Sequence, residues 1–374
     1  MARFSLLGAL VMITLVLGSC QHKERTLRLL VWEGYADPVF VRPFELSHHC
    51  KVEAFYMKTS DELYDNLRHP KGGEEYDIVS PSSDIAQTIV DDDLAAPLDN
   101  APLFKDRAIV STLRAPLLKG KKVYAVPFMW GPNLLLYDEE AFAEGPPSGW
   151  SVLWDPQYRH RVAVWDDLST IYMAAQLLGC ENRSSACGYA ISAPPDSTVI
   201  FNLGQNQLKR IEAELLVLQP RQWSTATELT SLFERHEVVA AMGWPLITNQ
   251  LRKSGFPIGE LVPKEGTTGW IDYLMIPKAS RQKDLAHQFL DYLRKPETQR
   301  WVAEVTGYAP TDDSPATMAQ FTPDERAVLH LYDKRYSDKV YLWQPIPERG
   351  AYERVWQDVK ESWTREAKQH GTSH

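Results

Sequence analysis

Four short apolar runs in this chain lead directly into a tryptophan, at Trp32, Trp130, Trp165 and Trp244. Apolar runs of this length that end in loop residues are typical of buried strands in an α/β protein. Open α/β sheets bind ligands at the carboxyl ends of their strands, so these indoles are expected to border one cleft. A fifth tryptophan lies in Gly269-Trp270-Ile271-Asp272, and most of the five have a carboxylate within a few residues.

Strand-like and helix-like segments alternate from residue 27 onward. The expected strands are 27–31, 52–57 and 76–79, and the expected helices are about 38–46, 61–67 and 85–91. Alternation of this kind predicts an α/β sheet with helices on its faces. The loops at 32–35 and 80–84 both follow a strand, so we expect them at one edge of one sheet.

A second set of elements begins near Tyr137. It has expected strands at 162–165 and 238–242 and an expected helix across 208–218. A chain of 374 residues is longer than most single domains, which favours two lobes. A ligand held by loops of both sets would lie between the lobes. Near the C-terminus, Trp356 and Trp363 have the helical spacing of a stripe that faces the core.

The N-terminus resembles an export signal. One Arg precedes an apolar stretch of about 14 residues at 4–17, which is too short to span a bilayer. The sequence Leu17-Gly18-Ser19-Cys20 resembles a bacterial lipobox. We therefore expect a signal peptide at 1–19, a lipidated Cys20 and a tether at 20–26, with ordinary cleavage as the alternative.

The remaining cysteines are Cys50, Cys180 and Cys187. A disulfide between Cys180 and Cys187 is expected because they flank a polar loop in an exported chain. Neighbouring residues His48-His49-Cys50 cannot converge like spaced zinc ligands, so no metal site is predicted. No cofactor is expected either. The net charge of -9 disfavours nucleic acid as a partner and favours cationic ligands.

Several residues in the post-strand loops are candidate ligand contacts. Trp270 and Asp272 are two positions apart, so in an extended segment an indole and a carboxylate lie on the same side. Flat π faces attract cations and carboxylates bind ammonium groups, so the expected ligand is an organic cation. The other candidate contacts are Trp32, Glu33, Tyr35, Ser82, Asp84, Asp167 and Trp244. Each has an alternative structural role, such as helix capping by Asp84 or packing by Trp32.

Enzymatic function is not expected. The chain lacks a Gly-x-Ser-x-Gly elbow, a phosphate-binding P-loop and a His-Glu-x-x-His motif. Paired acids with tryptophans also occur in glycoside hydrolases, which leaves that class as an alternative. The lack of a barrel repeat and the lipoprotein-like start weigh against it.

Five motifs occur in an order that resembles the bacterial spermidine/putrescine-binding proteins, which are extracellular solute-binding proteins. Each motif is weak alone, and together they extend over nearly the whole mature chain. They are Val31-Trp32-Glu33-Gly34-Tyr35, the segment 76–84, Val126-Pro127-Phe128-Met129-Trp130-Gly131, the segment 263–272, and Gly307-Tyr308-Ala309-Pro310.

The resemblance implies a type II periplasmic-binding-protein fold, with mixed sheets flanked by helices and joined by hinge strands. It implies lobe 1 at 27–136 and 272–316 and lobe 2 at 137–271 and 317–374. It also implies a monomer that closes on one polyamine and delivers it to a membrane ABC permease. By position, the implied walls are Trp32, Tyr35, Ser82, Trp244, Trp270 and Tyr308, the implied ammonium partners are Asp167 and Asp272, and the implied polar contact is Gln344.

The chain departs from the family pattern at two positions. Relatives commonly carry an acid where this chain has Thr170, and often Thr or Ser where it has Glu33. The sequence therefore leaves open whether putrescine, spermidine or another small cationic or amino-acid-like solute is the ligand. An amino acid would require an Arg for its carboxylate, and none is evident in the post-strand loops.

Overall fold

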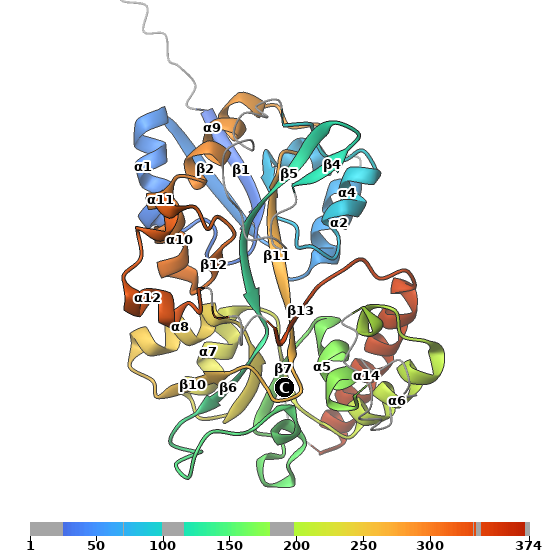
Figure 1. The fold of residues 1–374 in the computed structure, drawn as a ribbon. Coiled ribbons are helices and arrows are strands. Elements are labelled where there is room, and N and C mark those ends of the chain that lie inside the picture. The colour runs from blue at the N-terminus through green and yellow to red at the C-terminus, as the bar shows by residue number, and fades with distance from the viewer. Residues whose placement is uncertain are drawn as a thin grey trace, which may run out of the picture.

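The computed structural model describes residues 25–69, 71–98, 116–179, 198–331, 333 and 338–370 (Figure 1). The signal peptide expected at 1–19, the lipidation expected at Cys20 and the disulfide expected between Cys180 and Cys187 lie outside these residues. Two mixed sheets, each flanked by helices, form the described part of the chain. We call the larger sheet with its helices the first lobe and the smaller sheet with its helices the second lobe.

The sheet of the first lobe has eight strands among the described residues. Their order is β12 (Ala309–Pro310), β5 (Lys122–Pro132), β11 (Thr267–Met275), β3 (Ile78–Val79), β1 (Arg25–Val31) and β2 (Cys50–Tyr56), with β13 (Val340–Leu342) beside β11 and β4 (Leu117–Lys119) beside β5. Its helices are α1 (Pro38–His48), α2 (Ser60–Arg68), α3 (Gly72–Glu75), α4 (Ala86–Asp91), α9 (Lys283–Leu293), α10 (Pro296–Thr306), α11 (Pro315–Met318) and α12 (Pro323–Val328).

Parallel pairing in this sheet places the two predicted loops together. β1 pairs in parallel with both β2 and β3, and Leu30 is opposite Val79. The loops that follow β1 and β3 therefore leave the same edge of the sheet, which confirms the prediction. An isolated bridge between Ser82 and Asp272 connects the second loop to β11.

Helix boundaries here follow local capping chemistry. Asp37 accepts a hydrogen bond from the Val39 amide, and Pro38 occupies the first turn of α1, where a missing N–H costs nothing. The helix ends at His49, which has a left-handed conformation with φ of 48°. At α2, the Thr59 side chain accepts from the Glu62 amide. These caps lie within two residues of the predicted starts at 38 and 61.

The sheet of the second lobe has five strands in the part of the chain that the structure describes. Their order is β10 (Ile258–Leu261), β6 (Leu134–Asp138), β9 (Ala240–Gly243), β7 (Val162–Trp165) and β8 (Arg221–Trp223). Its helices are α5 (Ser169–Leu177), α6 (Gln205–Leu216), α7 (Ala226–Glu234), α8 (Pro245–Ser254) and α14 (Arg349–His370), with short 3-10 turns at Trp150–Trp154, Pro156–Tyr158 and Val199–Phe201.

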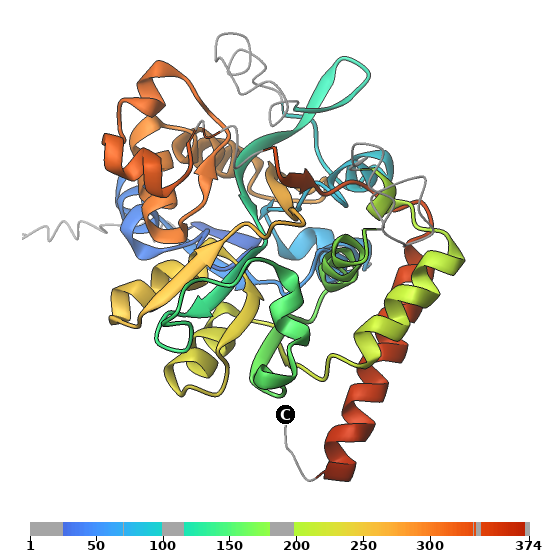
Figure 2. The same ribbon diagram turned by 60° about the horizontal axis from the view of Figure 1, so that its bottom comes forward.

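The long C-terminal helix belongs to the second lobe. α14 lies alongside α6, as Figure 2 shows. The predicted core-facing residues Trp356 and Trp363 are buried, and the Trp363 indole donates to the Leu215 carbonyl. Tyr352 is also buried and joins α14 to the turn at Val199–Phe201 by donating to the Ile200 carbonyl. Packing of α14 therefore fixes its first turn, at Arg349, close to the boundary with the first lobe.

The chain crosses between the lobes where β5 runs into β6, where β10 runs into β11 and again between β13 and α14 (Figure 1). Buried Asn133 joins the first two crossings. Its side-chain amide donates to the Thr268 hydroxyl at 3.1 Å, and its backbone carbonyl accepts from the Thr267 hydroxyl at 2.6 Å. These bonds hold the first two connecting segments side by side, as expected of hinge strands. The predicted domain limits at 136/137 and 271/272 lie near these crossings and stay a prediction.

The described residues contain no helix that is long and apolar enough to cross a bilayer.

Candidate functional site

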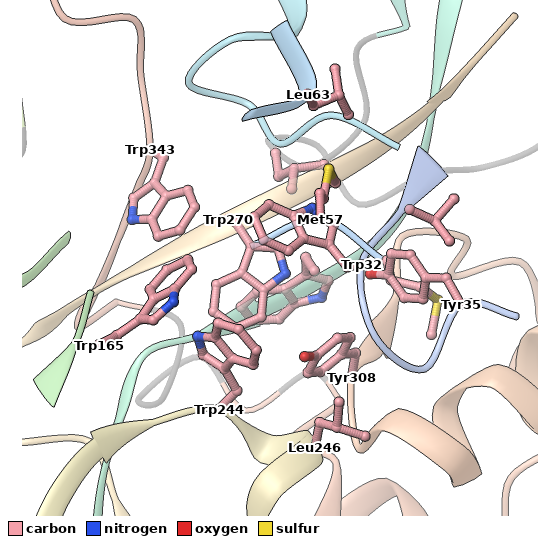
Figure 3. Close-up of a cluster of buried hydrophobic side chains, with 14 of the residues drawn as sticks. Trp32, Tyr35, Met57, Leu63, Trp165, Trp244, Leu246, Trp270, Tyr308 and Trp343 are labelled. Atoms are coloured by element: carbon pink, nitrogen blue, oxygen red, sulfur yellow. The ribbon is translucent and has the colours of Figure 1, made fainter. Parts of the chain in front are cut away.

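Aromatic side chains from both lobes meet around a small cavity between the sheets (Figure 3). Trp270 lies within β11, whereas the other aromatic residues lie at or beside the ends of β1, β7, β9, β12 and β13. The cavity has a volume of about 20 Å³, enough for roughly one water molecule. The lining residues are Trp32, Ser82, Trp165, Trp244, Trp270, Asp272, Tyr308 and Trp343.

The rings pack mainly edge to face. Trp244 contacts Trp165 with ring centroids 4.7 Å apart, and Trp270 contacts Tyr308 at 5.4 Å. Trp32, from the first lobe, reaches Trp165 and Trp244 of the second lobe at 6.1 and 6.3 Å. A cation or a methylene chain that separated these rings would therefore contact aromatic surface contributed by both lobes.

Asp272 supplies the carboxylate of this cavity. Only 1% of its surface is exposed, and it accepts hydrogen bonds from the Ser82 hydroxyl at 2.5 Å and the Tyr35 hydroxyl at 2.6 Å. The Trp32 indole in turn donates to Ser82 at 3.1 Å. Burial raises the pKa of Asp272 to about 7, and the two hydroxyl donors oppose that rise. Each carboxylate oxygen retains a lone pair that can accept from an ammonium group.

Asp167 lies on the second lobe, at the start of α5, and does not line the cavity. Its carboxylate accepts from the Ser169 amide at 2.8 Å. Although the residue keeps some exposed surface, the protein around its carboxyl displaces enough water to raise its pKa to about 7. The Thr170 hydroxyl donates to the Trp165 carbonyl at 2.7 Å, so it is already engaged with the backbone.

Three predicted contacts lie elsewhere. The Glu33 carboxylate accepts from the Ala226 amide at 2.6 Å and so joins the first lobe to the N-terminus of α7. Asp84 accepts from the Ser60 hydroxyl at 2.9 Å and is ion-paired with Arg349 at 3.3 Å. Gln344 is partly exposed and does not line the cavity. Ligand contact by these residues stays a prediction.

Trp165 lines the cavity, as its post-strand position predicts, although it is absent from the walls implied by the family resemblance. Trp343 was not predicted, and Trp130, expected at the same cleft, lines a larger cavity instead. Trp165 ends a buried strand in the same pattern as Trp32 and Trp244, so the sequence carried its signal. Trp343 precedes the predicted Gln344 and is held by its amide, which donates to the Gly269 carbonyl at 2.8 Å. Both indole N–H groups are buried and have no hydrogen-bond partner among the described residues. They could donate to an oxygen of a ligand or to water.

A larger cavity of about 300 Å³ lies beside the hinge, where α8 faces α10 and α12. Its arginines are already paired, Arg252 with Glu260 at 3.1 Å and Arg300 with Glu325 at 2.6 Å. The smaller cavity is the better candidate site for an organic cation, because there the Asp272 carboxylate, which has no cationic partner in the described part of the chain, meets the aromatic rings. No group of three or more His, Cys, Asp or Glu side chains within the described ranges could hold a metal ion.

Comparisons with known proteins agree with this architecture. The family model described as bacterial extracellular solute-binding protein matches residues 40–327. The spermidine/putrescine-binding periplasmic protein of Escherichia coli strain K12 is 24% identical over 347 residues, which cover 91% of this chain and 94% of that protein.

Two solved structures illustrate the fold similarity. The TpPotD lipoprotein of Treponema pallidum has a TM-score of 0.69 at 18% identity, covering 89% of this chain and 99% of that one. MotA of A. tumefaciens B6, in complex with glucopine, has a TM-score of 0.69 at 16% identity, covering 90% and 98%. At these identities the structures establish a shared fold, and it is the two-lobed α/β fold expected from the sequence.

Proposed function

Because this chain belongs to the bacterial extracellular solute-binding protein family, we propose that it captures a polyamine, putrescine or spermidine, between its lobes and delivers it to a membrane ABC permease. Membership of the family confirms the resemblance inferred from the sequence motifs. The protein is an exported solute-binding protein, and its family binds solutes without catalysing a reaction, which argues against the glycoside hydrolase alternative.

One observation carries the proposal for a polyamine. The buried Asp272 carboxylate has hydroxyl donors but no cationic partner among the residues that the structure describes, and it borders a cavity lined by tryptophan and tyrosine rings. Burying a methylene gains about 0.8 kcal/mol, and a hydrogen bond to a charged group is worth about 1.5 to 3 kcal/mol. A linear chain of methylenes between ammonium groups uses both kinds of contact. The E. coli relative, whose name specifies spermidine and putrescine, supports the same ligand class.

Ligand entry requires the rings to separate. A cavity of about 20 Å³ is far smaller than a linear diamine, so the two lobes or the side chains between them must move apart. The paired hinge segments allow such opening. Closure around the ligand then excludes water from the ion pair at Asp272 and strengthens it. The closed arrangement also gives the permease a surface that differs from that of the open protein.

A thermal-shift screen tests the proposed ligand class. Putrescine and spermidine are expected to raise the melting temperature of the mature protein, whereas sugars are not. A ligand present at 100 times its dissociation constant stabilises by about 2.7 kcal/mol, which is readily measured. Stabilisation by a sugar with no response to either polyamine would refute the proposal.

A second candidate is an amino-acid-like solute. It is favoured by the Trp165 and Trp343 indole N–H groups, which have no hydrogen-bond partner within the described residues. An ammonium cannot accept a hydrogen bond, whereas a carboxylate or hydroxyl can. The fold is compatible, since MotA was solved with glucopine. Including 4-aminobutyrate in the thermal-shift panel separates the candidates. Like putrescine it has a short linear chain, but it carries a carboxylate in place of one ammonium group, so its binding would support the amino-acid-like solute.

We also propose that the mature protein is anchored through a lipid on Cys20, since its N-terminal sequence resembles a lipobox. Cys20→Ala is expected to release the protein into the soluble fraction or to leave the precursor unprocessed. Membrane fractionation and blotting of the wild-type and variant proteins measure this. Processed Cys20→Ala protein that stays with the membrane would show that another feature anchors it.

A further inference from the structure

An arginine of the second lobe is inserted among acids of the first lobe. Arg349 opens α14, and its Nε lies 2.7 Å from an Asp61 oxygen while its Nη1 lies 3.3 Å from an Asp84 oxygen. Glu353, one turn along the helix, is 3.6 Å away. The Arg349 side chain is 18% exposed and that of Asp84 is 8% exposed. Burial opposes the charged arginine, but the surrounding carboxylates raise its pKa above the usual value.

These ion pairs lie next to the candidate site. Asp84 is two residues from Ser82, which hydrogen-bonds Asp272, and its charge raises the pKa of both Asp272 and Asp167. The positive charge of Arg349 acts on Asp167 in the opposite direction. Asp272, Asp84 and Asp167 thus form a set of acids across the two lobes, and Arg349 already neutralises one of them.

Taking the polyamine proposal as its basis, we infer that Arg349 is a specificity-determining residue. Its guanidinium acts as an internal cation that takes the place of an additional ligand ammonium beside Asp61 and Asp84. The cleft therefore favours a diamine such as putrescine over a triamine such as spermidine. Asp272 holds one ammonium of the diamine, and Asp167 on the second lobe holds the other.

Charge repulsion gives this preference its physical basis. An ammonium that approached Asp84 would meet the guanidinium of Arg349, and at short range like charges repel strongly in a poorly hydrated cleft. Displacing Arg349 instead would break its contacts with Asp61 and Asp84 at once. Thr170 adds no negative charge at the Asp167 end. A third ammonium that approached Asp61 or Asp84 thus finds both acids already paired with Arg349.

The test is the ratio of the dissociation constants for spermidine and putrescine, measured by titration calorimetry. Wild-type protein is expected to bind putrescine more tightly. Arg349→Gln frees Asp61 and Asp84, and it should shift the ratio toward spermidine by about tenfold, the equivalent of about 1.4 kcal/mol. Arg349→Lys, which keeps the charge, should stay near the wild-type ratio. Arg300→Gln is the matched control, since Arg300 pairs with Glu325 beside the other cavity.

The ratio distinguishes selectivity from a structural role. If Arg349 only holds the lobes together, Arg349→Gln weakens both ligands equally and the ratio is unchanged, which overturns the inference while the proposed function stands. If wild-type protein binds neither amine, the proposed function itself fails. Should Arg349→Gln not fold, the double variant Arg349→Gln, Asp61→Asn removes one of the acids left without a partner and should shift the ratio in the same direction.

Discussion

Asp272→Asn is expected to weaken polyamine binding by about tenfold to a hundredfold, because a charge-assisted hydrogen bond is worth about 1.5 to 3 kcal/mol. The substitution keeps the size of the side chain and an oxygen that can accept from Tyr35 or Ser82, but it removes the charge that attracts an ammonium. Titration calorimetry of the folded variant measures the loss.

Asp166→Asn is the matched control for this substitution. Asp166 is a neighbouring partly exposed acid that is bound by Lys360 at 2.8 Å and by the Trp356 indole at 3.0 Å, and it does not line the cavity. Its variant should bind polyamine nearly as well as the wild type. If Asp272→Asn also stays within about twofold of the wild type, Asp272 is not the ammonium partner.

Polyamine affinity is expected to fall below pH 7, by up to about tenfold per pH unit for each of the two carboxylates that must lose its proton to bind. Burial raises the pKa of Asp272 and Asp167 to about 7, so acidification protonates the carboxylates that a cation requires. The amines, with pKa values near 10, stay charged throughout this range. Calorimetry with putrescine between pH 5.5 and 8.5 measures the slope, and a flat profile would contradict the assignment of these acids.

The stability of the ligand-free protein, in contrast to its polyamine affinity, should increase as the pH falls. An acid whose folded-state pKa is raised from 3.8 to about 7 binds more protons in the folded than in the unfolded state between these values. Its contribution to stability is therefore fully present below about pH 4 and is lost as pH rises toward 7. Asp272→Asn should reduce this pH dependence, which denaturant unfolding at several pH values measures.

Local patterns in the sequence were sufficient where the site depends on local geometry. Trp270 and Asp272 are two apart on β11, and both line the cavity, as strand alternation predicts. The loops after β1 and β3 meet because parallel strands with helical crossovers bring their carboxyl ends to one edge. The prediction of Trp165 at the cleft was equally local, since it ends a buried strand.

Long-range pairings could not be predicted from the sequence. The sequence offered helix capping as the other role for Asp84, yet its partners are Ser60 and Arg349, and the latter is 265 residues away. Glu33 binds an amide 193 residues away. The choice between Trp343 and Gln344 depends on the register of β13 against β11, because adjacent residues of an extended segment point to opposite sides. Such contacts depend on how the two lobes pack, which no local pattern encodes.

A crystal structure of the mature protein with putrescine would test the central claim most directly. The account predicts an amine nitrogen within about 3 Å of the Asp272 carboxylate, the distance of a charge-assisted hydrogen bond. It also predicts that the methylenes lie between the rings of Trp270, Tyr308 and Trp244, which must separate from their present contacts. Putrescine bound in the larger cavity between α8 and α10, with the rings around Asp272 still in contact, would contradict it.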